Sequence, residues 1–175
     1  TREILPAGSA GLLCVRGAVT SGYAKDPATT AAVFDADGFY LSGDLGYFDH
    51  EGHVHFVGRG TDMIKTGGIN VSPAEVEDVL QGHPGIRQAH VVGIPDPVEG
   101  ELIAAVVERT AGMTPISGVE IREFVRLRLA SYKVPHRVLF ASDEDLPRTS
   151  TGKVPKRLLR EKVLAALSGA GPFSQ

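Results

Sequence analysis

The spacing of hydrophobic residues divides the chain into a first part rich in strands and a second part that mixes strands and helices. Residues 53–59 alternate apolar and polar side chains, which predicts a strand with one solvated face. Runs at 11–16 and 39–48 also predict strands, and a short helix is predicted at 26–34, where an aspartate precedes a proline. Glycine-ended turns flank the second of these strands. Residues 1–58 are therefore expected to form a sheet with tight turns.

Longer amphipathic segments follow in the second part. Ser72 and Pro73 have the residue types that begin a helix, and Val76, Val79 and Leu80 give that helix one apolar face. The pattern predicts helices at 72–80, 118–130 and 155–167, two short strands within 62–71, and strands at 87–95, 101–109 and 136–142. This order predicts an α+β fold in which helices pack against a small mixed or antiparallel sheet.

Composition narrows the class of protein. The 175 residues are 42% hydrophobic and 22% charged, with a net charge of −3, which indicates a globular chain and argues against a nucleic-acid partner. The lone cysteine, Cys14, excludes an intramolecular disulfide and fits a reducing, cytoplasmic location. No apolar run approaches the roughly 18 residues of a transmembrane segment. The first residues lack the pattern of a secretory signal and an initiator methionine, so a fragment is expected.

The stretch PRTSTGK, residues 147–153, raises a question of chemistry because a lysine ends a loop of small, hydroxylated residues. A P-loop would need a glycine where Pro147 stands and a serine or threonine where Val154 stands. The stretch is therefore not a P-loop, and Lys153 must meet its partner in another geometry.

Asp44 and Arg59 are candidate ligand contacts beside glycines. A carboxylate after a strand can accept hydrogen bonds from both hydroxyls of a ribose, although a turn aspartate bonding its own backbone fits the same pattern. The fork of Arg59 suits a phosphate, and a surface ion pair is the alternative. Gly60 permits backbone angles that suit a hinge.

Other candidates have simpler alternatives. Gly67 and Gly68 would let a narrow ligand pass close to the backbone, but they also suit a plain hairpin turn. The basic side chains of the last helix could meet a phosphorylated cofactor, or form a solvated helix face. The six histidines show no metal-ligand spacing, so no metal site is expected.

Taken in order, these segments resemble the C-terminal third of the adenylate-forming superfamily, which includes acyl-CoA synthetases, the adenylation domains of nonribosomal peptide synthetases and luciferases. The likeness runs from about residue 22 to residue 160. It rests on the segments YLSGDLGYFDHEG, VGRGTDMIKTGGINVSPAEVEDVL, GIPDPVEGE, YKVPHRV and LPRTSTGKVPKRLLR.

The resemblance implies a role for each candidate residue. Asp44 would hold the ribose of ATP or AMP, and Arg59 would also touch the nucleotide. Gly67 and Gly68 would border the tunnel for the thiol arm of CoA. Lys153 would reach the carboxylate and the α-phosphate during adenylation. Thr61 stands where the family usually has a hinge aspartate or lysine, so this chain departs from the family pattern at the hinge.

The resemblance also implies a reaction and an organisation. A carboxylate would react with Mg²⁺-ATP to give an acyl adenylate, and CoA would then take the acyl group as a thioester. Residues 1–58 would be the β-rich end of the large N-terminal domain, and 59–175 the C-terminal lid domain. The upstream phosphate loop and acyl pocket are not in this sequence, so the chain alone is expected to be inactive and to need that N-terminal domain.

Three functions fit the sequence. The leading one is the C-terminal part of an ATP-dependent acyl-CoA synthetase acting on a fatty acid or another carboxylic acid. The second is an adenylation domain that loads a carrier protein. The third is a non-catalytic module that retains the fold, and the joint presence of Asp44, Arg59 and Lys153 argues against it.

Overall fold

The computed structural model describes residues 3–174, which form two compact units. The first unit ends at Thr61 and the second begins at Asp62. This division lies close to the boundary expected after residue 58. The assignment of the two parts to the large domain and the lid domain of the superfamily stays a prediction.

The first unit is a three-stranded antiparallel sheet with one short helix. Asp26 caps that helix by accepting a hydrogen bond from the backbone N–H of Thr29, and Pro27 occupies its first turn. The strands lie in the order β1-β2-β3, and the elements are β1 (Gly11–Val15), α1 (Pro27–Val33), β2 (Tyr40–Phe48) and β3 (Val54–Arg59).

The second unit is a mixed five-stranded sheet covered by helices. Its strand order is β5-β4-β7-β6, and β8 runs parallel to β7 while the other pairs are antiparallel. The α+β class with a small mixed sheet is thereby confirmed. The strands are β4 (Ile64–Thr66), β5 (Ile69–Val71), β6 (Ile86–Asp96), β7 (Gly100–Arg109) and β8 (Arg137–Phe140), and the helices are α2 (Pro73–Gln81), α3 (Gly118–Arg126) and α4 (Lys156–Leu167).

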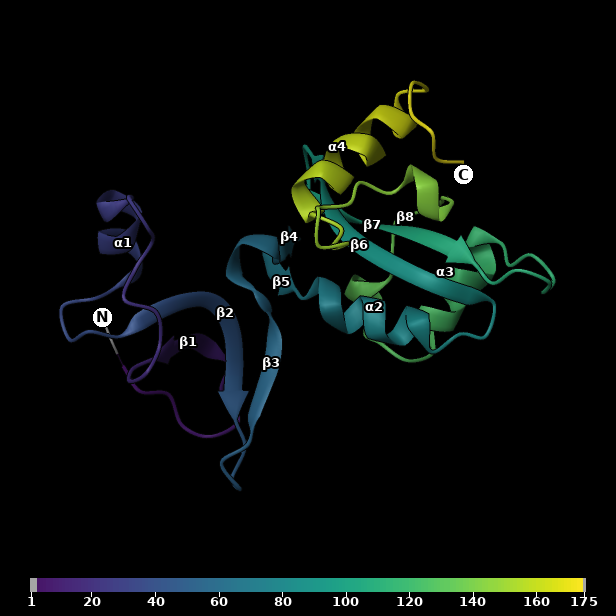
Figure 1. Ribbon diagram of the computed structural model, residues 1–175. Coiled ribbons are helices and arrows are strands. Elements are labelled where there is room, and N and C mark those ends of the chain that lie inside the picture. Colours follow the sequence, from purple (N-terminus) through teal and green to yellow (C-terminus); the bar gives the residue numbers. More distant parts are fainter. Residues whose placement is uncertain (1–2, 175) are drawn as a thin grey trace. The chain divides into compact units, whose positions relative to one another are not determined.

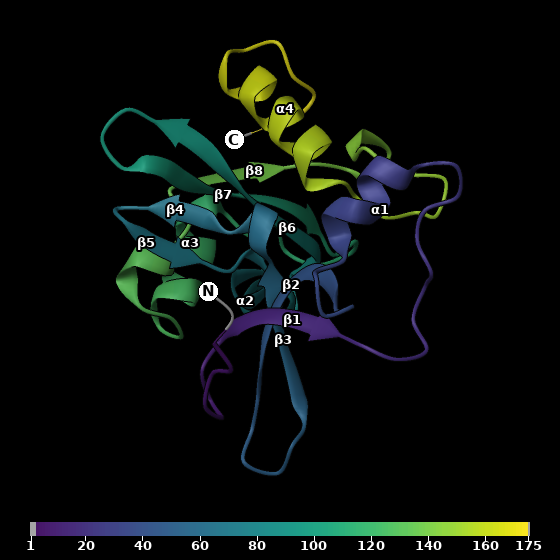
Figure 2. The same ribbon diagram turned by 90° about the vertical axis from the view of Figure 1, so that its left-hand side faces the viewer.

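Strand β7 separates two apolar layers of the second unit. Because successive side chains of a strand point to opposite faces, Ile103, Ala105 and Val107 face one side while Ala104 and Val106 face the other. Helices α2 and α3 cover the first side, and α4 covers the second (Figures 1 and 2). A strand buried on both faces explains the continuous apolar run of β7.

Two predicted elements are shorter than the sequence pattern suggested. Helix α3 ends at Arg126 rather than at residue 130, because the N–H of Arg128 donates to the carbonyl of Val125, three residues back, instead of that of Phe124. The Phe124 carbonyl accepts a hydrogen bond from the Arg128 side chain. Strand β8 covers residues 137–140 of the predicted 136–142. Within residues 3–174, no helix has the length and apolar character needed to cross a lipid bilayer.

Candidate functional site

Asp44 and Arg59 form an ion pair across β2 and β3. Their Cα atoms are partners in the strand register, and the Nε–H of Arg59 donates to Oδ1 of Asp44 at 2.9 Å. The Asp44 side chain is 29% exposed and that of Arg59 is 62% exposed, so both remain open to a ligand. The structure therefore shows the surface ion pair that was the alternative interpretation of Arg59. Contact of Asp44 and Arg59 with a nucleotide stays a prediction.

The backbone around Asp44 is fixed by its neighbours. Ser42 donates its hydroxyl hydrogen to the carbonyl of Leu13 at 2.7 Å and accepts the N–H of Asp44 at 3.0 Å. Gly43 has a φ of 77°, in the left-handed region that side chains disfavour. Ser42 thus ties Asp44 to β1, and the glycine permits the bend before it.

Tyr40 lies close to this pair, and the hydroxyl of Tyr23 interacts with it. The hydroxyl of Tyr23 is the largest influence that raises the pKa of Tyr40, and the Asp44 carboxylate also raises it while Arg59 lowers it. Tyr40 is therefore a neutral phenol beside two charged groups. No motif marks Tyr40 as a site residue, since its proximity to Arg59 depends on how the strands fold together.

Lys153 ends a tight loop in the second unit. The N–H of Thr149 donates to the carbonyl of Lys153 at 2.8 Å, and the hydroxyl of Thr149 accepts the N–H of Lys153 at 3.1 Å. Gly152 has a φ of 79° and donates its N–H to the carbonyl of Thr149. Within the part of the chain that the structure describes, the Lys153 ammonium makes no ion pair or hydrogen bond. The loop fixes the backbone and leaves the charge free.

Gly67 and Gly68 form the turn of the β4–β5 hairpin, with φ angles of 55° and 77°. The N–H of Gly67 donates to the carbonyl of Glu99 at 3.0 Å, and a Cβ on Gly67 would lie 2.9 Å from the Glu99 carboxylate. The local structure of Gly67 and Gly68 is therefore the plain hairpin turn that was the alternative to a ligand passage. A border for the CoA arm stays a prediction.

The sites predicted from the sequence divide between the two units. Asp44 and Arg59 lie in the first unit and contact each other, while Gly67, Gly68 and Lys153 lie in the second. Thr61, at the expected hinge, lies in a short 3-10 turn, Gly60–Asp62, where the units divide.

The basic side chains of α4 contact protein groups. Each of the four contacts a carboxylate or a backbone carbonyl: Lys156 contacts Glu77, Arg157 contacts Glu161, Arg160 contacts Glu101, and Lys162 contacts the carbonyl of Asp145. Their charge is thereby largely offset, which supports the structural alternative over a cofactor-binding cluster.

Two histidines, His53 just before β3 and His55 on β3, contact the carboxylate of the turn residue Asp49. Oδ2 of Asp49 contacts Nδ1 of His53 at 3.2 Å and Nε2 of His55 at 2.8 Å. The hydrogen bond with His55, followed by that from the His53 backbone, lowers the pKa of Asp49 to about 2. No cluster of three or more potential metal ligands occurs within residues 3–174.

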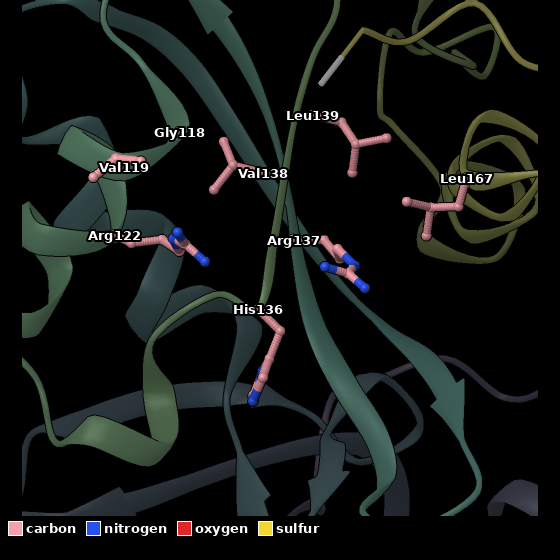
Figure 3. A pocket seen from close by; sticks show the side chains of 8 residues that line it. All are labelled: Gly118, Val119, Arg122, His136, Arg137, Val138, Leu139 and Leu167. Atoms are coloured by element: carbon pink, nitrogen blue, oxygen red, sulfur yellow. The ribbon is translucent and has the colours of Figure 1, made fainter. Parts of the chain in front are cut away.

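A shallow pocket of about 220 Å³ lies at the outer edge of β8, between α3 and α4. Figure 3 shows Arg122, His136 and Arg137 around this edge, with Leu139 and Leu167 on the α4 side. None of the predicted site residues lines it, so this pocket is separate from the groups discussed above.

This chain is similar to a known domain family and to several CoA ligases. Residues 75–153 match the model of the AMP-binding enzyme C-terminal domain. The chain is 41% identical over 165 residues to the probable CoA ligase CCL9 of Humulus lupulus, covering 93% of this chain and 30% of that protein. It is 42% identical over 145 residues to the long-chain-fatty-acid–CoA ligase FadD13 of Mycobacterium tuberculosis, covering 83% of this chain and 28% of that protein.

The fold is also similar to solved structures. ATP-bound MatB from Rhodopseudomonas palustris superposes with a TM-score of 0.81 at 41% identity, covering 90% of this chain and 31% of MatB. The chain therefore spans less than a third of the length of these relatives.

Proposed function

The chain belongs to the adenylate-forming superfamily, as a C-terminal portion of it, and from this premise we propose that it is part of an ATP-dependent acyl-CoA ligase. The observation that carries this proposal is that the Lys153 ammonium makes no ion pair or hydrogen bond among residues 3–174. It ends a hydrogen-bonded loop, whereas the basic residues of the adjoining helix α4 contact carboxylates or a carbonyl. An exposed, unpaired charge on a fixed backbone suits delivery to a substrate.

The proposed reaction has two halves. In the first, a carboxylate oxygen of the acid attacks the α-phosphorus of ATP, and the bond from that phosphorus to the bridging oxygen breaks, releasing pyrophosphate. In the second, the sulfur of CoA attacks the acyl carbon, AMP leaves, and the thiol proton is lost. Lys153 would stabilise the negative charge that gathers around phosphorus in the first half.

Asp44 and Arg59 would position the nucleotide. The pair uses Oδ1 of Asp44, and the carboxylate has further lone pairs for the two ribose hydroxyls. Arg59, which is 62% exposed, would extend beside it towards the nucleotide. Mg²⁺ would be bound through the phosphates of ATP. Gly67 and Gly68, at the exposed turn of the β4–β5 hairpin, would border the path of the CoA arm.

The acyl acceptor and the acid are finer parts of the proposal. CoA is favoured because curated relatives are named CoA ligases, and a fatty acid is a candidate acid because FadD13 is named for that substrate class. A carrier protein as acceptor is the alternative. Presenting CoA and a phosphopantetheinylated carrier to the acyl adenylate would separate the two.

Exchange between ATP and labelled pyrophosphate in the full-length protein tests the function. Exchange should require a carboxylic acid, and Asp44→Asn should raise the KM for ATP roughly 10- to 100-fold, because charge-assisted hydrogen bonds to the ribose are lost. Asp37→Asn, at an exposed turn of the same unit, serves as the control and should behave as the parent. Absence of exchange across a panel of aliphatic and aromatic acids would contradict the proposal.

A further inference from the structure

The side chain of Arg148 makes a hydrogen bond to the backbone of the loop that carries Lys153. Arg148 lies five residues before Lys153, and its Nη1–H donates to the carbonyl of Gly152, the residue next to the lysine, at 2.7 Å. The internal hydrogen bonds of Thr149 shape the loop, and this additional bond joins the loop to a side chain that is itself held by the sheet.

A row of alternating charges anchors Arg148. Its Nη2 group contacts the carboxylate of Asp143, which also lies 3.2 Å from Nη2 of Arg87. Arg87 on β6 makes two hydrogen bonds to the carboxylate of Glu108 on β7. Hydrogen bonding from Arg148 is the largest influence that lowers the pKa of Asp143, so that group stays ionised. We call Arg148, Asp143, Arg87 and Glu108 the loop clasp.

We propose that Arg148 is a positioning residue for Lys153, holding the carbonyl of Gly152 so that the lysine ammonium enters the adenylation site from one direction. The inference rests on the proposed function of Lys153. Its physical basis is that the guanidinium bonds the Gly152 carbonyl and the Asp143 carboxylate at once. Nη2 also donates to Oε1 of Gln88 at 3.3 Å, which adds a contact with β6.

The planar fork of arginine is what this arrangement requires. Two nitrogens face partners on different sides, whereas the single ammonium of a lysine cannot hold both with the same rigidity. The Arg148 side chain is 32% exposed and Asp143 is 49% exposed, so their contact contributes little to global stability. Loss of Arg148 should therefore loosen the loop without unfolding the domain.

Half-reaction kinetics of the full-length protein test the proposal. Arg148→Ala should lower the kcat of adenylation by up to about 100-fold with little change in KM for ATP, because a small misplacement of a reacting group costs that much. Arg148→Lys should recover only part of this loss. Thioester formation from supplied acyl adenylate and CoA should stay near the parental rate in both variants.

A matched control separates positioning from a general charge effect. Arg126→Ala removes another exposed arginine of the same unit, together with its ion pair to Glu123. This variant should keep the parental adenylation rate. An equal loss in Arg126→Ala and Arg148→Ala, or full recovery in Arg148→Lys, would overturn the positioning role.

Hydrogen exchange reports the loop independently of activity. In Arg148→Ala the N–H groups of Gly152 and Lys153 should exchange faster while the thermal midpoint is unchanged. The Gly152 carbonyl is then no longer held, so the loop hydrogen bonds to Thr149 should open more often. If Lys153→Ala keeps full adenylation, the proposed function fails. If Lys153→Ala loses adenylation but Arg148→Ala retains both rate and loop protection, only the positioning role fails.

Discussion

In the second unit, the fold shifts the protonation equilibrium of one partly buried histidine. His90, half-buried on β6, has its pKa lowered to about 4, first by burial and then by the charges of Lys156 and Arg148. Its Nε2 atom is buried and has no hydrogen-bond partner among residues 3–174. The fold therefore favours the neutral imidazole at this position, next to the segment that carries Lys153.

This shift predicts a pH dependence of stability. The unfolded histidine titrates near 6.5 and the folded one near 4, so the unfolded state binds more protons between these values. The free energy of unfolding should fall as the pH drops from about 6.5 to 4, by about 1–2 kcal/mol after allowance for solvent screening. Chemical denaturation at several pH values measures it. In His90→Gln, the free energy of unfolding should depend less on pH between about 4 and 6.5 than in the parent. An unchanged dependence would contradict its assignment to His90.

Residue identities alone could not predict the Asp44–Arg59 contact. The sequence marked both residues and the turn between their strands, and a regular hairpin from the pair Phe48–Val54 would set Asp44 opposite Gly58. A register shift between Leu45 and Gly46 brings Arg59 opposite Asp44 instead. Such a bulge depends on the packing of three strands, which the pattern of apolar positions does not specify.

At the scale of elements, helix positions were largely predictable because caps and apolar faces are local. Proline begins α1 and α2, and Ser72 accepts the N–H of Glu75 as a cap. The early end of α3 was not predictable, because it depends on the Arg128 side chain bonding the Phe124 carbonyl while the Arg128 N–H bonds that of Val125. The parallel pairing of β8 with β7 likewise depends on the crossover connection over residues 110–136, which contains α3.

The N-terminus of α3 offers a test of capping. Ser117 accepts the N–H of Glu120, and the Glu120 carboxylate accepts the N–H and hydroxyl of Ser117. Ser117→Ala should lower the free energy of unfolding by about 1 kcal/mol, measured by denaturant titration, because the cap is lost. Ser117→Thr retains a hydroxyl and should keep most of the stabilisation that the cap contributes. Equal stability of all three proteins would show that the cap contributes nothing.

At the scale of the whole molecule, the proposed chemistry needs groups from both units. Asp44 and Arg59 belong to the first unit and Lys153 to the second. The loop clasp holds the backbone beside Lys153, while the lysine ammonium has no hydrogen bond or ion pair with any described residue. We propose that the second unit presents Lys153 for adenylation and withdraws it for thioester formation. From the sequence, this movement of Lys153 could be inferred only through the family resemblance, because residues 147–153 alone do not identify what the lysine binds.

The most direct test of this account is the rate of each half-reaction in full-length Lys153→Ala. Adenylation, followed by pyrophosphate release, should fall by at least about 100- to 1,000-fold, the typical cost of losing one well-placed stabiliser of transition-state charge. Thioester formation from supplied acyl adenylate and CoA should proceed at nearly the parental rate. Equal losses in the two halves, accompanied by a lower thermal midpoint, would contradict the account and assign Lys153 to the support of the fold.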